Sequence, residues 1–318
     1  MKTAKRRQPD LSVTIAGIQF ATPVWTASGT AGTGEEINQW CDVRHLGAMV
    51  TKSVSLSPRA GHPYPRTVET ASGLLNAIGL QNKGIEAFVR EELPRLREMP
   101  TRVVVNLVGD TQEEYAELAR RLSAEDGIDA YELNLSCPNV EKGIDQGADP
   151  QWVGSCTAKV RAATERPMIV KLTPNTHDID ALARAAEDAG ADAISAINTL
   201  VGMAVNHRTF GPRLANVTGG LSGPAVKPVA LALVYKIARA VRIPVIGIGG
   251  IAAGTDAAEF LIIGASAVQV GTATFRQPDA AVTVADELSD YLQEKGMKSV
   301  GELIGRFDAP KPKLTGAG

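Results

Sequence analysis

The sequence is poor in the residues that build disulfide frameworks, zinc sites and membrane spans. Its 318 residues include three cysteines and 4% aromatic residues, and no run reaches the roughly 18 apolar residues of a membrane helix. The cysteines, Cys41, Cys137 and Cys156, are odd in number and far apart, which indicates neither a disulfide framework nor a metal cluster. A reducing cytoplasm therefore fits the chain best.

A strong charge of one sign is also lacking. The formal net charge is −2, which gives no reason to expect nucleic acid or an acidic membrane surface as a partner. The N-terminus is basic, but no apolar segment of signal-peptide length follows it. We predict flexible tails at residues 1–10 and 306–318 around one domain over residues 11–305.

What the chain has in abundance is a short β-rich run followed by a longer helical pattern, repeated throughout. A β-hairpin is predicted at 12–20, and strands are predicted at 23–27, 48–52, 102–107, 130–135, 168–172, 193–197, 245–249 and 267–270. Helices are predicted at 85–96, 111–123, 151–164, 179–189, 228–239, 254–261 and 279–294. This alternation predicts an α/β fold, a single (β/α)8 TIM barrel with an N-terminal hairpin. A doubly wound fold is disfavoured because no early Gly-x-Gly-x-x-Gly follows a strand.

Every predicted strand ends in polar or glycine-rich residues. The carboxyl ends of barrel strands face one mouth, so these groups should converge there. They are Ser28, Lys52, Ser53, Asn106, Asn134, Lys171, Asn198, Thr199, Gly249, Gly250, Gly271 and Thr272. Glycines after the seventh and eighth strands favour a phosphate site, because exposed backbone N–H groups and close approach suit a phosphate.

Lysine and cysteine supply the reactive groups of this predicted mouth. Lys171 lies inside a strand and needs an anionic partner, because a buried ammonium without one is costly. Lys52 needs an anionic partner for the same reason. A cofactor that becomes anionic when reduced would supply one for both lysines. Cys137 follows the fourth strand in a polar loop; most lone loop cysteines have no catalytic role, but this one is flanked by Asn134 and Asn139.

Seven motifs together resemble the class 1 dihydroorotate dehydrogenases over residues 11–305. They are Thr51-Lys52-Ser53, the stretches 76–82 and 134–139, Val170-Lys171-Leu172, Asn198-Thr199, and the stretches 219–223 and 247–250. Residues 76–79 and 216–224 resemble the NAD-linked (1B) branch more than the fumarate-using homodimers. The cysteine at 137, where membrane-associated relatives carry serine, argues against quinone as oxidant.

The resemblance implies one FMN per chain and oxidation of dihydroorotate to orotate in pyrimidine (UMP) biosynthesis. The FMN would be bound by Ser28, Lys52, Ser53, Asn106, Asn134, Lys171, Ile197, Gly223, Gly249, Gly250, Gly271 and Thr272. The substrate would be bound by Lys52, Asn76, Ala77, Ile78, Gly79, Leu80, Asn134, Asn198 and Thr199. Cys137 would take the C5 proton, the C6 hydride would go to flavin N5, and Lys171 would stabilise the charge on the flavin.

The resemblance also implies a partner subunit. NAD⁺ would receive electrons through FAD and a [2Fe–2S] cluster on a second subunit, because this chain has neither a four-cysteine cluster motif nor a Rossmann fingerprint. A homodimer and a heterotetramer with that subunit are expected, with no metal on this chain. Residues 141–150 depart from the sequence that is typical of the branch. The segment after Cys137 is therefore the least certain part of the expected site.

Three other functions remain open at this point. The chain could be a fumarate-dependent class 1A enzyme, or it could resemble dihydropyrimidine dehydrogenase, which also uses a loop cysteine. It could also be a phosphate-binding barrel without redox chemistry, of the aldolase or isomerase type. Bound flavin would exclude the last, and activity on dihydrouracil rather than dihydroorotate would favour the second.

Overall fold

The fold is a barrel of eight parallel strands, as the sequence predicts. The computed structural model describes residues 8–32, 34–135 and 146–309. The strands run in the order β3-β16-β15-β10-β9-β8-β7-β4, and Gly47 N donates to Val24 O at 2.9 Å to join β4 to β3. Their bounds are β3 (Val24–Thr26), β4 (Ala48–Val50), β7 (Arg102–Leu107), β8 (Ala130–Asn134), β9 (Met168–Lys171), β10 (Ala193–Ala196), β15 (Val245–Ile248) and β16 (Ala267–Val270).

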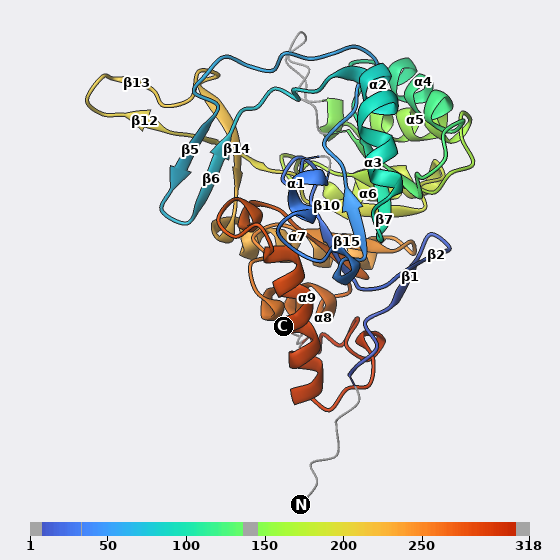
Figure 1. Cartoon of the computed structure of the whole chain (residues 1–318). Coiled ribbons are helices and arrows are strands. Elements are labelled where there is room, and N and C mark those ends of the chain that lie inside the picture. The colour runs from blue at the N-terminus through green and yellow to red at the C-terminus, as the bar shows by residue number, and fades with distance from the viewer. Residues whose placement is uncertain (1–7, 33, 136–145, 310–318) are drawn as a thin grey trace, which may run out of the picture.

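Helices cover the outside of the barrel (Figure 1). The main ones are α4 (Gln112–Leu122), α5 (Pro150–Arg161), α6 (Ile179–Asp188), α7 (Lys227–Ala240), α8 (Gly254–Ile262) and α9 (Ala280–Glu294). Thr111, Asp149 and Asp178 cap α4, α5 and α6 by accepting a backbone N–H of the first turn. The helix predicted at 85–96 forms as α2 (Gly84–Ala87), a π-helical segment η2 (Phe88–Glu92) and α3 (Leu93–Arg97).

Short helical segments complete the chain. They are α1 (Glu35–Asn38) and the 3₁₀ turns η1 (Val43–His45), η4 (Gln146–Ala148), η5 (Pro224–Val226), η6 (Thr272–Phe275) and η7 (Val300–Glu302). Two of these, η5 and η6, directly follow residues of the predicted phosphate site. They therefore fix the direction in which the chain leaves the barrel mouth.

The barrel interior is divided into an apolar lower half and a polar upper half. The lower half is a buried cluster that includes Val104, Ala130 and Ile169. The predicted hairpin, β1 (Val13–Ile15) and β2 (Ile18–Phe20), packs Ile15 and Phe20 against this cluster from below. Side chains alternate along a strand, so the next inward positions after the apolar ones belong to a polar layer.

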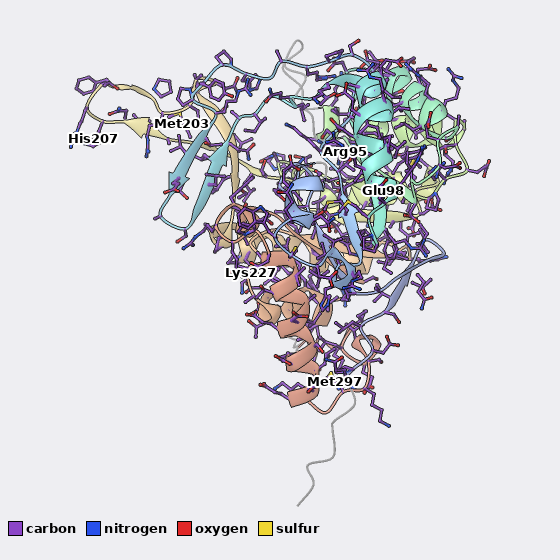
Figure 2. All side chains as sticks on the ribbon, viewed as in Figure 1. Arg95, Glu98, Met203, His207, Lys227 and Met297 are labelled. Carbon is purple, nitrogen blue, oxygen red and sulfur yellow. The ribbon has the colours of Figure 1, made fainter. Side chains whose placement is uncertain are left out.

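A four-stranded antiparallel sheet that we did not predict is inserted between barrel strands. Its strands are β5 (Thr67–Thr70), β6 (Gly73–Asn76), β11 (Leu200–Met203) and β14 (Thr218–Ser222), in the order β11-β14-β6-β5. The hairpin β12 (Val205–Asn206) and β13 (Gly211–Pro212) projects from it as an arm (Figure 1). Met203 and His207 lie along this arm (Figure 2).

The two ends of the described chain are attached to the domain. Asp10 N donates to Lys298 O, and Val300 N donates to Asp10 O. Phe307 N donates to Ile262 O, and its ring packs edge-on against Tyr235. Residues 1–7 and 310–318, most of the predicted tails, lie outside the described residues. Among the described helices, none is long and apolar enough to cross a membrane.

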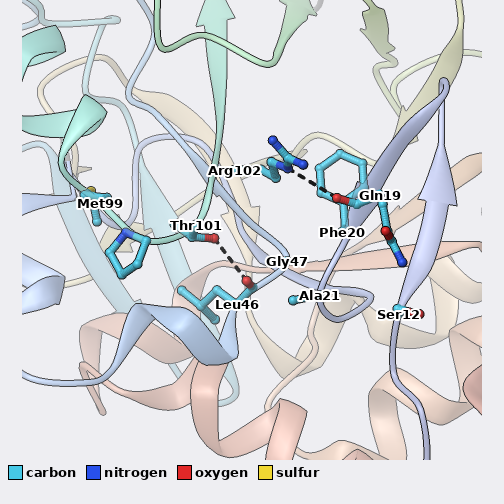
Figure 3. A pocket seen from close by; sticks show the side chains of 10 residues that line it. Ser12, Gln19, Phe20, Ala21, Leu46, Gly47, Met99, Thr101 and Arg102 are labelled. Carbon is cyan, nitrogen blue, oxygen red and sulfur yellow. Dashed lines mark hydrogen bonds between the residues drawn. The ribbon is translucent and has the colours of Figure 1, made fainter.

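A hollow of about 450 Å³ lies beside the hairpin rather than at the polar end of the barrel (Figure 3). Its rim is held by Thr101 Oγ1, which donates to Leu46 O, and by Arg102 Nε, which donates to Gln19 O. None of the predicted site residues lines it. We therefore do not associate this hollow with the chemistry.

Candidate active site

The predicted inward-facing lysine is buried in the polar layer. The Lys171 side chain is 6% exposed, and its ammonium lies 3.5 Å from Glu132 Oε1. It also donates to Ser28 Oγ at 3.2 Å, so it bridges the barrel interior and the end of β3. The anionic partner that Lys171 required is thus a residue of the chain itself, and the sequence analysis did not identify it.

Two amides continue this layer towards the ends of β7 and β8. Asn106 on β7 is fully buried, and its Oδ1 accepts from Ser53 Oγ at 2.5 Å. Asn134 ends β8, and its Oδ1 accepts from Asn198 Nδ2 at 3.1 Å. These hydrogen bonds join β7 to the segment after β4 and β8 to the segment after β10, and the four side chains form the polar wall of the barrel mouth.

Lys52 lies beyond the end of β4 and is half-buried. Burial lowers the pKa of its ammonium, and the nearby charge of Glu92 opposes this effect only in part. Among the described side chains, no carboxylate forms an ion pair with it. A ligand carboxylate at this position would therefore supply the missing counter-charge.

The glycines of the predicted phosphate site lie next to one another. A Cβ on Gly250 would lie 2.9 Å from Gly223 O, one on Gly249 3.5 Å from Ile197 Cγ1, and one on Gly223 3.5 Å from Thr272 Cγ2. Gly249 and Gly250 have φ of 132° and 73°. Within the described residues, the N–H groups of Gly249, Gly250 and Thr272 have no hydrogen-bond acceptor. Such unpaired N–H groups suit a phosphate.

The predicted substrate segment runs from the end of β6 into the following loop. Asn76 Nδ2 donates to Gly220 O at 3.2 Å. Thr199 packs on the other side of Gly220, since a Cβ there would lie 2.0 Å from Thr199 Oγ1. The inserted sheet therefore brings Asn76 and Thr199 together around Gly220, although they lie more than a hundred positions apart in the sequence.

Sequence reasoning missed two further polar residues near the site. Asn175 donates from Nδ2 to Thr199 O at 3.1 Å and accepts from Val201 N at 3.0 Å, which fixes the segment after β10. Lys227, labelled in Figure 2, packs beside Gly250, but its ammonium is bonded to Asp256 and Glu259. An asparagine two residues beyond Thr173 is a common turn signal, which hid the role of Asn175.

The three cysteines differ in location and in burial. Cys137 lies in residues 136–145, outside the described residues, as do Asn139 and the first half of the segment 141–150. Cys156 is buried in α5, and burial raises the pKa of its thiol to about 12. Cys41 is half-buried, and burial raises its pKa as well. These two thiols resist ionisation near neutral pH, which fits packing roles.

Comparison with known proteins identifies the family of the chain. The family model for dihydroorotate dehydrogenase matches residues 10–292. The chain belongs to the dihydroorotate dehydrogenase family. The chain is 55% identical to the dihydroorotate dehydrogenase B (NAD(+)) catalytic subunit of Geobacter sulfurreducens, over 95% of this chain and 99% of that protein. It is also 55% identical to the subunit of the same name from Geobacter metallireducens, over 94% and 98%.

A solved structure supports the dihydroorotate dehydrogenase fold directly. The enzyme from Eimeria tenella, crystallised with ferulenol, superposes with a TM-score of 0.77 at 25% identity and covers 95% of this chain and 89% of that chain. Family membership makes this chain an oxidoreductase. It confirms both the barrel and the family resemblance predicted from the motifs, including the likeness to the NAD-linked branch.

Proposed function

We propose that this chain oxidises dihydroorotate to orotate for pyrimidine biosynthesis, as the FMN-carrying catalytic subunit of an NAD-linked enzyme. The observation that carries the proposal is that three features meet at one end of the barrel: the buried Lys171, the amides of the polar wall, and the glycine cradle. The glycine cradle consists of Gly223, Gly249 and Gly250. The relatives that share more than half of its residues carry the corresponding name.

The residues at the barrel mouth fit an FMN. Unpaired N–H groups and positive φ angles at Gly249 and Gly250 allow a phosphate to approach the backbone closely. Ser53 and Asn106 offer hydroxyl and amide groups, and Lys171 supplies a buried positive charge. We assign the FMN to Ser28, Lys52, Ser53, Asn106, Asn134, Lys171, Ile197, Gly223, Gly249, Gly250, Gly271 and Thr272. When bound, FMN supplies the hydride acceptor, its N5 atom.

Dihydroorotate carries a carboxylate and a cyclic ureide, and the remaining mouth residues suit both. Lys52 would bind the carboxylate, because it is a half-buried cation with no ion-pair partner among the described side chains. Asn134 and Asn198 would form hydrogen bonds with the C=O and N–H groups of the ring. Residues 76–80 and Thr199 complete the proposed substrate site. Asn175 holds Thr199 in place through its carbonyl.

Cys137 is the proposed base that removes the C5 proton. It follows Asn134, the last residue of β8, by three positions in the sequence. Thiolate is the active form, and nearby cations would favour it. The cytoplasm is part of the same proposal, because a thiol base requires reducing surroundings.

NAD⁺ would be served through a second subunit that carries FAD and a [2Fe–2S] cluster. The names of the Geobacter relatives describe a catalytic subunit, which supports the existence of such a partner. We also propose a homodimer of this chain within the heterotetramer. The exposed apolar side chains of the arm and of the adjoining strand β11 support it, because large exposed apolar groups mark interaction surfaces. They are Val201, Met203, Val205 and Phe210.

Replacement of the cysteine tests the proposed chemistry. Cys137→Ala should reduce dihydroorotate oxidation by about a hundredfold or more, the usual contribution of a positioned base, while FMN stays bound. Cys137→Ser should retain a slower activity that rises at more alkaline pH. Cys41→Ala serves as the control and should keep most of the activity. Near-normal turnover by Cys137→Ala would show that the base is another residue.

A further inference from the structure

The most deeply buried charge in the barrel belongs to Glu132, which none of the predicted roles uses. Its side chain is fully buried in the middle of β8. Alternation along the strand places it on the inward face with Ala130 below and Asn134 above, while Tyr131 and Leu133 pack outward. A carboxylate in this position is costly unless its oxygens are fully hydrogen-bonded.

Four strands supply the groups that meet this carboxylate. Oε1 accepts from Asn106 Nδ2 on β7 at 2.7 Å and lies 3.5 Å from Lys171 Nζ on β9. Oε2 accepts from Ser195 Oγ on β10 at 2.9 Å and from Gln269 Nε2 on β16 at 2.7 Å. With its own strand β8, Glu132 thus joins five of the eight barrel strands.

Two of these partners, Lys171 and Asn106, also form hydrogen bonds with residues at the barrel mouth. Lys171 donates onward to Ser28 Oγ. Asn106 uses its Nδ2 on Glu132, and this leaves Oδ1 to accept from Ser53 Oγ. The carboxylate therefore fixes the position of one cation and the orientation of one amide, both of which belong to the proposed FMN site.

We propose that Glu132 is the positioning residue of the flavin site. It orients Lys171 and Asn106, and its negative charge offsets the positive charge that Lys171 offers to the reduced, anionic form of the cofactor. Charges in a water-poor interior interact more strongly than the same charges in water. Glu132 therefore holds the reduction potential of the bound flavin lower than Lys171 alone would set it. This inference rests on the proposed FMN site.

The Glu132→Gln variant of the FMN-loaded protein tests this role, because it removes the charge and keeps the size. The barrel can accept the new amide: Gln269 Oε1 is buried without a hydrogen-bond partner among the described residues, and the Ser195 hydroxyl can reverse its direction. We expect FMN to remain bound and its midpoint potential to shift to a more positive value. Spectroelectrochemistry measures that shift independently of turnover.

Ser195→Ala is the matched control, since it removes one hydrogen bond from Glu132 and leaves the carboxylate charge in place. It should lower the melting temperature while the flavin potential stays at the wild-type value. An unchanged potential in Glu132→Gln, or an equal shift in both variants, would overturn the proposal and leave Glu132 a purely structural tie between strands.

A second comparison measures the effect of the charge at position 132 without the Glu132→Gln single variant. Lys171→Gln and the double variant Lys171→Gln with Glu132→Gln differ only in the charge at position 132, and the double variant leaves no buried charge of this pair unpaired. The double variant should have the more positive potential, and equal potentials would overturn the proposal. If the wild-type chain holds no FMN at all, the proposed function fails as well, which is a different result from bound FMN with an unmoved potential.

Discussion

Lys52 is a half-buried cation whose charge weakens the folded protein until a ligand offsets it. Burial lowers its pKa below the ordinary value of 10.5, so the folded chain releases this proton at a lower pH than the unfolded chain does. The unfolded state then binds more protons between the two pKa values. The contribution of Lys52 to stability without ligand is therefore least favourable below the lowered pKa and improves as pH rises towards 10.5.

Ligand binding should show the opposite dependence on pH. Orotate carries a carboxylate that the Lys52 ammonium attracts, so its affinity should fall as pH rises through the lowered pKa. Titration of the FMN-loaded protein with orotate over an alkaline pH series measures this. Lys52→Met should bind orotate weakly and lose that pH dependence, whereas Lys236→Met, at an exposed position of α7, should behave as wild type. The same alkaline fall in Lys52→Met would contradict the assignment.

Single residues also show where sequence reasoning ended. The buried position of Lys171 and its need for an anion were predicted correctly, but its partner was sought in a cofactor rather than in Glu132. The signal was present, because Glu132 shares the inward face of its strand with Asn134. Which inward residues meet across the barrel depends on strand register, and β8 pairs with β9 so that Asn134, not Glu132, stands opposite Lys171. A single sequence does not reveal that offset.

Among the elements, the loop after β15 makes the most specific demand on its residues. Gly250 has φ of 73°, and a Cβ there would lie 2.8 Å from Lys227 Cβ. Gly296, after α9, has φ of 70° with no atom within 4 Å of its would-be Cβ. The two positions therefore share a backbone conformation and differ in how crowded they are.

Alanine at these two glycines should separate backbone strain from cofactor binding. Gly296→Ala should cost about 1 kcal/mol of unfolding free energy through strain alone and leave FMN affinity unchanged. Gly250→Ala should cost at least as much and also weaken FMN binding by roughly tenfold or more, because the phosphate loses its close approach to the backbone. Denaturant unfolding and fluorescence titration with FMN measure the two effects. Equal FMN affinity in both variants would remove Gly250 from the phosphate site.

The barrel elements could be predicted from sequence, and the inserted sheet could not. Each barrel strand is a short apolar run followed by polar or glycine residues, and a helix with the usual spacing separates most of them. The strands β5, β6, β11 and β14 are short, and β14 contains Gly219 and Gly220. β14 and β6 pair across more than a hundred residues, so no local pattern shows that the pairs β5–β6 and β11–β14 form one sheet. That sheet is nevertheless what brings Asn76 beside Thr199.

At the scale of the whole molecule, the two ends of the barrel have separate tasks. The lower end is closed by the hairpin over an apolar cluster, which stabilises the fold. The upper end carries the polar layer, the amide wall and the glycine cradle. The arm extends from the inserted sheet on the same side as the substrate segment, so contacts between subunits at the arm would lie close to the site.

The proposed division of tasks between two subunits rests on the sequence of the whole chain. The chain carries neither a four-cysteine cluster motif nor an early Rossmann fingerprint, and we propose that its own redox group is a single FMN. Substrate should therefore reduce the FMN of the isolated chain, and the FMN should then stay reduced until the partner subunit is added. NAD⁺ alone should not reoxidise it, whereas the partner subunit together with NAD⁺ should. Efficient reoxidation by fumarate would instead place the chain in the fumarate-using branch.

The most direct test of the central claim is an anaerobic titration of the purified, FMN-loaded chain with dihydroorotate. We predict that the flavin absorbance is lost as dihydroorotate is added and that one orotate is formed for each FMN reduced. Dihydrouracil, which lacks the carboxylate, should leave the spectrum unchanged. A flavin that stays oxidised with dihydroorotate, or that is reduced by dihydrouracil alone, would contradict the account.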